Sequence, residues 1–233
     1  MSAELIIILL LGMVFMCIPI GVQMKWYGIA LWKAIPASIA IIVTGVCGSQ
    51  LWFYIENGYF EGRSLYGAVF FAPVVYLPLS LLIHIPYTKC LDFCAPTACM
   101  LLAVLKYECI KEGCCQGMVI GLDENLCYIR FPSQIVEAVA FIAVAIIPYC
   151  MSRIPKYRGK IYPWSLVLYG SSRFVLNFFR EISKPYALGL SAGSFWSLCA
   201  LIIGAVWLYL AAKKDNAAKN KGGQVAAEEW PAK

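Results

Sequence analysis

The chain has 233 residues, of which 61% are hydrophobic and 14% are charged, and its mean hydropathy is +0.74. Soluble domains are about 45–50% apolar and about 25% charged, so this composition excludes a soluble enzyme, a disordered chain and a nucleic-acid-binding protein. The formal net charge of +6 has to be divided between the two sides of a membrane, because Lys and Arg gather in the cytoplasmic loops of membrane proteins.

Apolar runs along the chain predict seven membrane-spanning helices, since one helix needs about 20 apolar residues to cross the hydrocarbon core. In chain order the expected spans cover residues 3–22, 27–54, 65–85, 90–106, 135–151, 161–179 and 194–212. Lys33 and Pro36 interrupt the second span, and Arg173 lies inside the sixth. The first span is not expected to be a cleavable signal, because the region before its apolar core carries Glu4 and no Lys or Arg.

The polar segments complete the expected domain plan. Residues 1–212 are expected to form an all-α polytopic membrane domain with seven transmembrane helices. The polar stretch 106–133 is expected to be an external cap segment between the fourth and fifth helices, and residues 213–233 a polar cytoplasmic tail rich in Lys and Ala.

The distribution of basic residues predicts the orientation of the chain. With the N-terminus outside and the C-terminus inside, twelve of the 19 Lys and Arg residues lie in inner segments: Lys25, Lys33, Lys89, Arg153, Lys156, Arg158, Lys160, Lys213, Lys214, Lys219, Lys221 and Lys233. The other seven lie in outer segments: Arg63, Lys106, Lys111, Arg130, Arg173, Arg180 and Lys184. The basic cluster at 153–160 and the tail fall on the inner side together only if the number of spans is odd, which agrees with seven.

Ionisable side chains concentrate in the outer segments and at the outer ends of the spans. They are Glu56, Glu61, Arg63, Lys106, Glu108, Lys111, Glu112, Asp123, Glu124, Arg130, Glu137, Arg173, Arg180 and Glu181. Charges at membrane depth are unfavourable unless they are paired or functional, although long side chains at helix ends also reach the interface. The pattern indicates a site facing the outer leaflet, and Arg173 is its strongest candidate because it lies several residues inside an apolar run.

The eleven cysteines do not form a metal-binding pattern. Four lie in the external stretch, at Cys109, Cys114, Cys115 and Cys127, without paired CxxC spacing, and the one histidine, His84, is expected on the other side of the membrane. The other seven lie in or beside apolar spans, where cysteine behaves as a small hydrophobic residue. No metal site is expected, and one external disulfide, for example involving Cys127, stays open.

Six short motifs occur in order along the chain: WYG at 26–28, GRSLYGA at 62–68, LDFCAPTACMLLAVLKYECIKEGCCQG at 91–117, FPSQIVEA at 131–138, LYGSSRFVLNFFRE at 168–181 and LSAGSFWSL at 190–198. Together they resemble the motifs of the prolipoprotein diacylglyceryl transferase family, a family of seven-span proteins with the N-terminus outside. The resemblance covers nearly the whole chain up to about residue 212.

The resemblance implies an enzyme of the bacterial plasma membrane whose active site faces the outer leaflet. Such an enzyme transfers diacylglyceryl from phosphatidylglycerol to the lipobox cysteine thiol of a prolipoprotein, forming a thioether and releasing glycerol phosphate. The implied partners are phosphatidylglycerol, prolipoprotein lipobox segments and membrane lipid, with no cofactor, no metal and no nucleic acid.

The motif positions also imply a set of site residues. The catalytic candidates are Arg173, Lys106, Tyr66 and Glu137. The substrate-binding candidates are Tyr27, Arg180, Gln134, Gly113 and Gly117. The leaving phosphate needs fixed cations, and an arginine can hold it bidentately whereas a lysine supplies a point charge. Glu137 is expected to pair with Arg173 in the absence of lipid, and the two glycines are as well explained by a tight turn.

Several motif positions differ from the family pattern. Lys106, Cys109 and Cys114 stand where the family signature has arginine, asparagine and glutamate, Tyr66 stands for a histidine, and Asn177 for a glutamate. Without an outer histidine, the proton of the thiol is expected to go to Glu137 or to a tyrosine–water pair, or else the cations alone stabilise the thiolate.

Three functions therefore stay open from the sequence. The first is the diacylglyceryl transferase itself. The second is a catalytically impaired, lipid-binding homologue, and the third is a sibling transferase that uses a phospholipid headgroup with a different acceptor.

Overall fold

The computed structural model describes residues 20–60, 62, 64–111, 113, 115–122, 127–181 and 185–220. Nearly all of the first expected span, residues 3–22, lies outside the described residues, as does the tail beyond residue 220. The described part of the tail, residues 213–220, continues the last helix instead of leaving it.

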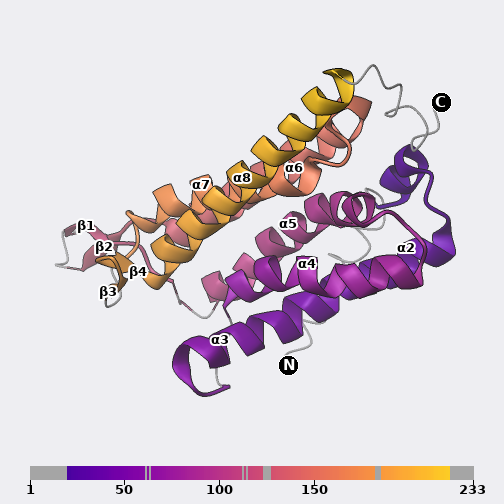
Figure 1. Ribbon diagram of the computed structural model, residues 1–233. Coiled ribbons are helices and arrows are strands. Elements are labelled where there is room, and N and C mark those ends of the chain that lie inside the picture. Colours follow the sequence, from indigo (N-terminus) through magenta and orange to yellow (C-terminus); the bar gives the residue numbers. More distant parts are fainter. Residues whose placement is uncertain are drawn as a thin grey trace.

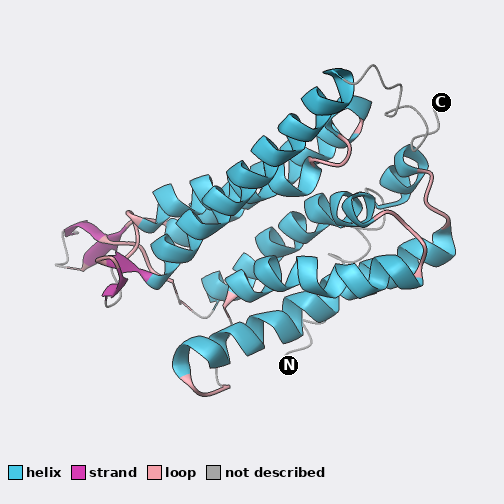
Figure 2. Ribbon diagram, viewed as in Figure 1, coloured by secondary structure: helices cyan, strands magenta, loops and turns pink. Residues whose placement is uncertain are grey.

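Helices make up most of the described chain (Figure 2). Residues 20–27 are helical, and the later helices are α2 Leu31–Val43, α3 Ser49–Asn57, α4 Leu65–Leu82, α5 Tyr87–Lys111, α6 Ser133–Ser152, α7 Ile161–Asn177 and α8 Ala192–Asn220. A π-helical turn, Thr44–Gly48, joins α2 to α3, and a 3-10 turn, Pro155–Tyr157, precedes α7. In Figure 1, α6, α7 and α8 run side by side, and α5 lies between them and the group formed by α2, α3 and α4.

Five described segments are long and apolar enough to cross a membrane. They are Leu31–Asn57, Leu65–Leu82, Tyr87–Lys111, Ser133–Ser152 and Ala192–Ala217. Each overlaps an expected span, although the segment expected at 90–106 is longer and runs to Lys111 at its outer end. The segment expected at 161–179 is helical as α7, but it has only 17 residues. The protein is thus a mainly helical, multi-pass membrane protein, and the number of seven spans stays a prediction.

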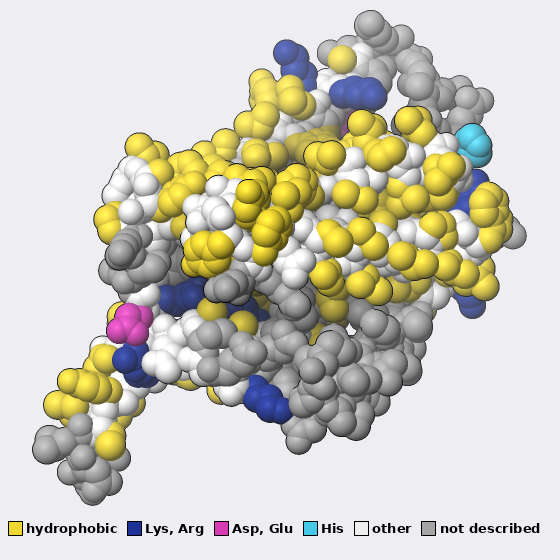
Figure 3. Space-filling model, turned by 90° about the horizontal axis from the view of Figure 1, so that it is seen from below, with side chains coloured by type: hydrophobic (Ala, Val, Ile, Leu, Met, Phe, Trp, Pro, Cys, Tyr) yellow, Lys and Arg dark blue, Asp and Glu magenta, His cyan; other side chains and the backbone are white. Residues whose placement is uncertain are grey.

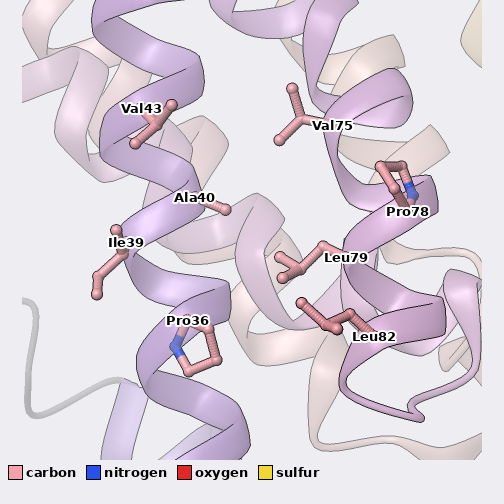
Figure 4. A pocket seen from close by; sticks show the side chains of 8 residues that line it. All are labelled: Pro36, Ile39, Ala40, Val43, Val75, Pro78, Leu79 and Leu82. Carbon is pink, nitrogen blue, oxygen red and sulfur yellow. The ribbon is translucent and has the colours of Figure 1, made fainter.

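Apolar side chains cover the outside of the helices, as lipid-facing surfaces require. Figure 3 shows hydrophobic side chains over the face formed by α2, α3 and α4. Leu31, Ile55, Leu81 and Leu82 on this face are each more than 60% exposed. Between α2 and α4 lies a shallow groove of about 380 Å³. Only apolar side chains of these two helices line it, among them Pro36 of α2 and Leu82 of α4 (Figure 4).

Proline residues interrupt the backbone ladder inside several helices, and other helices compensate for the lost bonds. Pro73 has no N–H, so the carbonyl of Val69, four residues earlier in α4, lacks its usual helical donor. The hydroxyl of Tyr162 in α7 donates to that carbonyl at 2.9 Å. This contact satisfies a buried acceptor and joins α4 to α7, since a proline is tolerated in a membrane helix when a neighbour supplies the missing bond.

A pair of glycines lets α4 approach the π-helical turn closely. A Cβ added to Gly67 would lie 2.0 Å from the carbonyl oxygen of Gly48, and one added to Gly48 would lie 3.0 Å from the carbonyl oxygen of Gly67. No side chain fits at Gly67 without moving the backbone. The hydroxyl of Thr44 donates to the carbonyl of Ala40 at 2.6 Å where the helix changes from α to π geometry, a local bond that stabilises such irregular turns.

The outer and inner segments expected from the sequence gather at two opposite ends of the helices. At one end, Arg153 lies over the ring of Trp26 at 5.8 Å, and Arg158 lies over the ring of Tyr27 at 5.4 Å. At the other end are two short antiparallel hairpins (Figure 1), β1 Val119–Leu122 with β2 Tyr128–Arg130 and β3 Pro185–Ala187 with β4 Leu190–Ser191. The β1–β2 hairpin falls within the expected cap segment.

A buried aspartate fixes the start of α7. Asp92 of α5 is 1% exposed and accepts hydrogen bonds from the backbone N–H groups of Gly159 and Tyr162, the latter at 2.9 Å. The first N–H groups of a helix have no partner within it, and a carboxylate at this end also interacts favourably with the helix dipole. Asp92 therefore caps α7 from a neighbouring helix.

Candidate functional site

The centre of the candidate site is a buried carboxylate surrounded by three cations. Glu137 of α6 is fully buried and forms ion pairs with Lys106 of α5 and Arg173 of α7. The Nε atom of Arg180 lies 3.7 Å from the same carboxylate. The expected pairing of Glu137 with Arg173 is confirmed, and Lys106 is a second partner.

Three different helices bring these charges together. Lys106 lies near the end of α5, Glu137 one turn into α6 and Arg173 one turn before the end of α7. Lys106 is 2% exposed and Arg173 is 6% exposed, so neither cation is solvated. A buried charge is tolerated only when partners compensate it, and one carboxylate shared by several cations leaves an excess of positive charge at this place.

Backbone contacts position the third cation, which lies just beyond α7. Arg180 and Gly117 form a β-bridge, and the N–H of Met118 donates to the carbonyl of Phe179 at 3.0 Å. Arg130 pairs with Glu181 at 2.6 Å and donates to the carbonyl of Gly117 at 3.3 Å. The β1–β2 hairpin and the two residues before it thereby hold Arg180 in place.

A large cavity opens beside the cations, with a volume of about 1110 Å³. Lys106, Arg173, Arg180 and Tyr66 line it, whereas Glu137 is not among its lining residues and lies behind the cations. Most of the remaining wall is apolar and comes from α2, α4, α5 and α7, for example at Ile41, Ala72, Leu91, Ala95 and Leu166. The cavity thus has a cationic part and a long apolar part.

Tyr66 lies on the cavity wall, but its hydroxyl is used within the protein. It donates to the carbonyl oxygen of Gly193 at 2.6 Å and lies 3.0 Å from Oγ of Ser197. This contact joins α4 to the start of α8. Tyr66 therefore shapes the cavity, and its hydroxyl is already engaged.

Tyr27 does not join the cationic site. It is fully buried at the opposite end of the helices, where its ring meets Phe93 at a centroid distance of 6.5 Å and the guanidinium of Arg158. The expectation that Tyr27 shares a binding site with Arg173 is corrected by this placement. The expected topology already indicated this, because Lys25, two residues before Tyr27, is assigned to an inner segment and Arg173 to an outer one.

The other three substrate-binding candidates are two glycines in the segment before β1 and a glutamine in the first turn of α6. Gly113 has a φ of +65°, a conformation that favours glycine. A Cβ at Gly117 would lie 2.1 Å from the carbonyl oxygen of Phe131. Gln134 lies in the first turn of α6, one turn before Glu137, and is not among the residues that line the cavity. The substrate-binding role of these three residues stays a prediction.

Two cavity residues were not singled out from the sequence. Tyr169 lies one helical turn before Arg173, is 2% exposed, and its hydroxyl has no hydrogen-bond partner within the described part of the chain. The spacing of four residues from Arg173 was the available signal, because such residues share a helix face. Glu56, counted among the outer acidic residues, also lines the cavity.

The described cysteines are distributed over several helices and the segment before α6. Among the described residues no group of three or more His, Cys, Asp or Glu side chains is suited to hold an ion. Cys109 and Cys115 are partly exposed and Cys127 is exposed, and the external disulfide that stayed open remains a prediction. Cys114 lies outside the described residues.

Comparison with known proteins identifies the family. A family model described as prolipoprotein diacylglyceryl transferase matches residues 47–210, a range that contains all four charged residues of the site. The chain belongs to this family. The match also includes five of the seven described helices from α2 onward in full.

Curated relatives carry a matching name over shorter stretches. The chain is similar to a phosphatidylglycerol–prolipoprotein diacylglyceryl transferase of Mannheimia succiniciproducens, with 31% identity over 39% of this chain and 36% of the relative. The enzymes of that name in Burkholderia thailandensis and Cupriavidus metallidurans are 35% and 37% identical, over 39% and 38% of this chain and 32% and 34% of the relatives. The matched part of the chain thus spans about a third of the length of these relatives.

Proposed function

We propose that this protein is a phosphatidylglycerol–prolipoprotein diacylglyceryl transferase. It would take phosphatidylglycerol as the donor and the lipobox cysteine of a prolipoprotein as the acceptor. Family membership and the names of the relatives support the reaction class. The observation that carries the proposal is the cavity itself.

The cavity is chemically complementary to an anionic lipid. Arg173, Lys106 and Arg180 supply positive charge at one part of its wall, where a phosphodiester is the complementary group. Most of the remaining wall of this cavity of about 1110 Å³ is apolar and suits acyl chains, and small-molecule pockets combine mostly apolar walls with a few placed polar groups. A net neutral headgroup would gain less from these cations than that of phosphatidylglycerol.

The reaction is a displacement at the glyceryl carbon that carries the phosphate ester. The sulfur of the thiolate forms a bond to that carbon, and the bond between the carbon and the phosphate oxygen breaks with its electron pair. Glycerol phosphate leaves as an anion, and the thiol proton passes to an acceptor. The cations stabilise the negative charge that develops on the leaving oxygen, which is the largest contribution in many such reactions.

Each residue of the site has a distinct part in this proposal. Arg173 and Lys106 hold the phosphate, and Arg180 assists at the headgroup. The unpartnered hydroxyl of Tyr169 faces the same cavity and donates to the lipid. Glu137 acts as a positioning residue, because it is buried behind the cations and fixes their side chains.

We also propose seven membrane spans, with the N-terminus outside and the C-terminus inside. The site would then face the outer leaflet of a bacterial plasma membrane. The separation of the outer and inner segments to opposite ends of the helices supports this arrangement. The short helix α7 would be the sixth span, with its charged end at the cavity.

A transfer assay tests the function directly. Purified protein is incubated with phosphatidylglycerol and a peptide that contains a lipobox cysteine, and the product is analysed by mass spectrometry. We expect a diacylglyceryl adduct on the cysteine, none on the matched peptide with serine in its place, and much less with phosphatidylethanolamine as donor. Lipid binding without any adduct would contradict the transferase and favour the impaired, lipid-binding homologue.

A further inference from the structure

A single carboxylate faces the cavity without being tied to a cation. Among the residues that the structure describes, Glu56 is the only Asp or Glu on the cavity wall. It lies at the end of α3, and Ser64 and Tyr66, which follow α3 in the chain, line the same cavity. The cations lie on α5, α7 and the segment after α7.

The surroundings of Glu56 leave its carboxylate free to accept a proton. The side chain is half-buried, and Oε1 is buried with no hydrogen-bond partner in the described part of the chain. Leaving a buried polar atom unpaired is unfavourable, so this oxygen on the cavity wall is available to a molecule that enters the cavity.

Glu137, the acceptor considered from the sequence, is placed differently. It is fully buried, does not line the cavity and is engaged by Lys106 and Arg173. The remaining polar groups on the cavity wall include tyrosine hydroxyls, cysteine thiols and the three cations, all of which ordinarily carry their protons at neutral pH. Among the described residues, Glu56 is the one carboxylate on this wall.

We propose that Glu56 is the proton acceptor for the incoming thiol, an inference that rests on the proposed transferase function. The S–H bond breaks, its proton moves to the Glu56 carboxylate, and the electron pair stays on sulfur. The thiolate then forms the bond to the glyceryl carbon as glycerol phosphate leaves. Glu56 returns the proton to water or to the departing phosphate, so no further reactant is needed.

A peptide whose nucleophile is already deprotonated distinguishes a proton acceptor at Glu56 from a residue that only binds or positions the substrates. Free thiols have a pKa of about 8.5 and are mostly protonated at neutral pH, whereas a selenol is already ionised. We compare the parent and Glu56→Gln with two lipobox peptides, one with cysteine and one with selenocysteine. Positioned proton transfer contributes about 10²–10⁴-fold in rate, so Glu56→Gln is expected to lose at least about 100-fold with cysteine and less than about fivefold with selenocysteine.

Two variants and one binding measurement complete the design. Ile55→Ala, at the preceding residue of α3, removes an exposed side chain that does not line the cavity and is expected to leave the cysteine rate within about twofold. Glu56→Asp keeps a carboxylate and is expected to lose less than Glu56→Gln. Native mass spectrometry is expected to show equal binding of phosphatidylglycerol to the parent and Glu56→Gln, which excludes a folding defect.

The outcomes distinguish this inference from the function on which it rests. If the parent itself forms no adduct with either peptide, the transferase function fails. If the parent is active and Glu56→Gln matches it with cysteine, or loses equally with both peptides, Glu56 is not the proton acceptor. A variant that merely changes its preference between phospholipid headgroups would likewise overturn the proposal and make Glu56 a headgroup-recognition residue.

Discussion

Arg173 of α7 and Glu137 of α6 form an ion pair in which Glu137 is fully buried and Arg173 nearly so. The carboxylate also pairs with Lys106, so two helices are linked to α6 through one side chain. A phosphate that enters the cavity would compete with Glu137 for the same donors. Lipid binding and local stability are therefore expected to be linked.

Replacement of Arg173 tests the main anion-binding side chain. Arg173→Ala should lose phosphatidylglycerol binding, because it removes the more deeply buried of the two guanidinium groups on the cavity wall. Arg173→Lys should lose less, since it keeps the charge but not the bidentate geometry. Native mass spectrometry of the two variants, with Ser172→Ala as a neighbouring control, measures this. An alanine variant that retains the lipid as well as the parent would make Arg173 structural.

Lys106 is expected to act on turnover through its charge. Lys106→Ala should abolish formation of the diacylglyceryl peptide, and it leaves Glu137 with one ion-pair partner fewer. Lys106→Arg should keep or raise the rate, because a guanidinium retains the charge and adds a second donor. Lys111→Ala, at the exposed end of the same helix, is the control. Undiminished activity of Lys106→Ala would contradict a role in phosphate binding.

Replacing the buried carboxylate of Glu137 should lower the free energy of unfolding and should increase the rise in Tm that phosphatidylglycerol causes. Glu137→Gln leaves three cations without their counter-charge, and breaking a buried ion pair costs about 3–5 kcal/mol. The rise in Tm on adding phosphatidylglycerol should be larger than in the parent, because the phosphate no longer competes with a carboxylate. Glu181→Gln breaks the exposed pair with Arg130 and should cost no more than about 1 kcal/mol. Equal thermal shifts in Glu137→Gln and the parent would refute the competition.

The cap of α7 should affect stability from the opposite end of the molecule. Asp92→Ala removes the acceptor for the N–H groups of Gly159 and Tyr162, and losing a helix cap costs about 0.5–2 kcal/mol. Thermal unfolding in detergent should show a lower Tm, with lipid binding retained well below that temperature. Asp215→Asn, which breaks an exposed pair with Lys160, serves as the control and should change Tm little.

Labelling with a membrane-impermeant thiol reagent tests the proposed orientation. Lys156 and Tyr128 are both exposed and lie in segments expected on opposite sides. In a background where the exposed Cys47, Cys127 and Cys150 are serine, Tyr128→Cys should react in intact cells and Lys156→Cys only after the cells are opened. Reaction of Lys156→Cys in intact cells would overturn the arrangement with the C-terminus inside.

Composition and periodicity were sufficient to predict the helices and the residues with unusual charge. Long apolar runs cannot be accommodated in water, so the described spans agree with the expected ones to within a few residues at most ends. The position of Arg173 inside such a run made a partner necessary, and Glu137 was the correct one. These features follow from the one-dimensional sequence because an unpaired charge in an apolar run, or an apolar run in water, is unfavourable whichever helices surround it.

The assembly of the site depends on contacts between helices, which no local pattern encodes. That Lys106 shares Glu137 with Arg173 and that Glu56 shares the cavity with the cations both follow from how α3, α5, α6 and α7 pack. Packing is decided by small contacts such as Gly48 against Gly67 and by bonds such as Tyr162 to Val69. The sequence therefore determined which side chains needed partners, and the tertiary structure decided which partners they found.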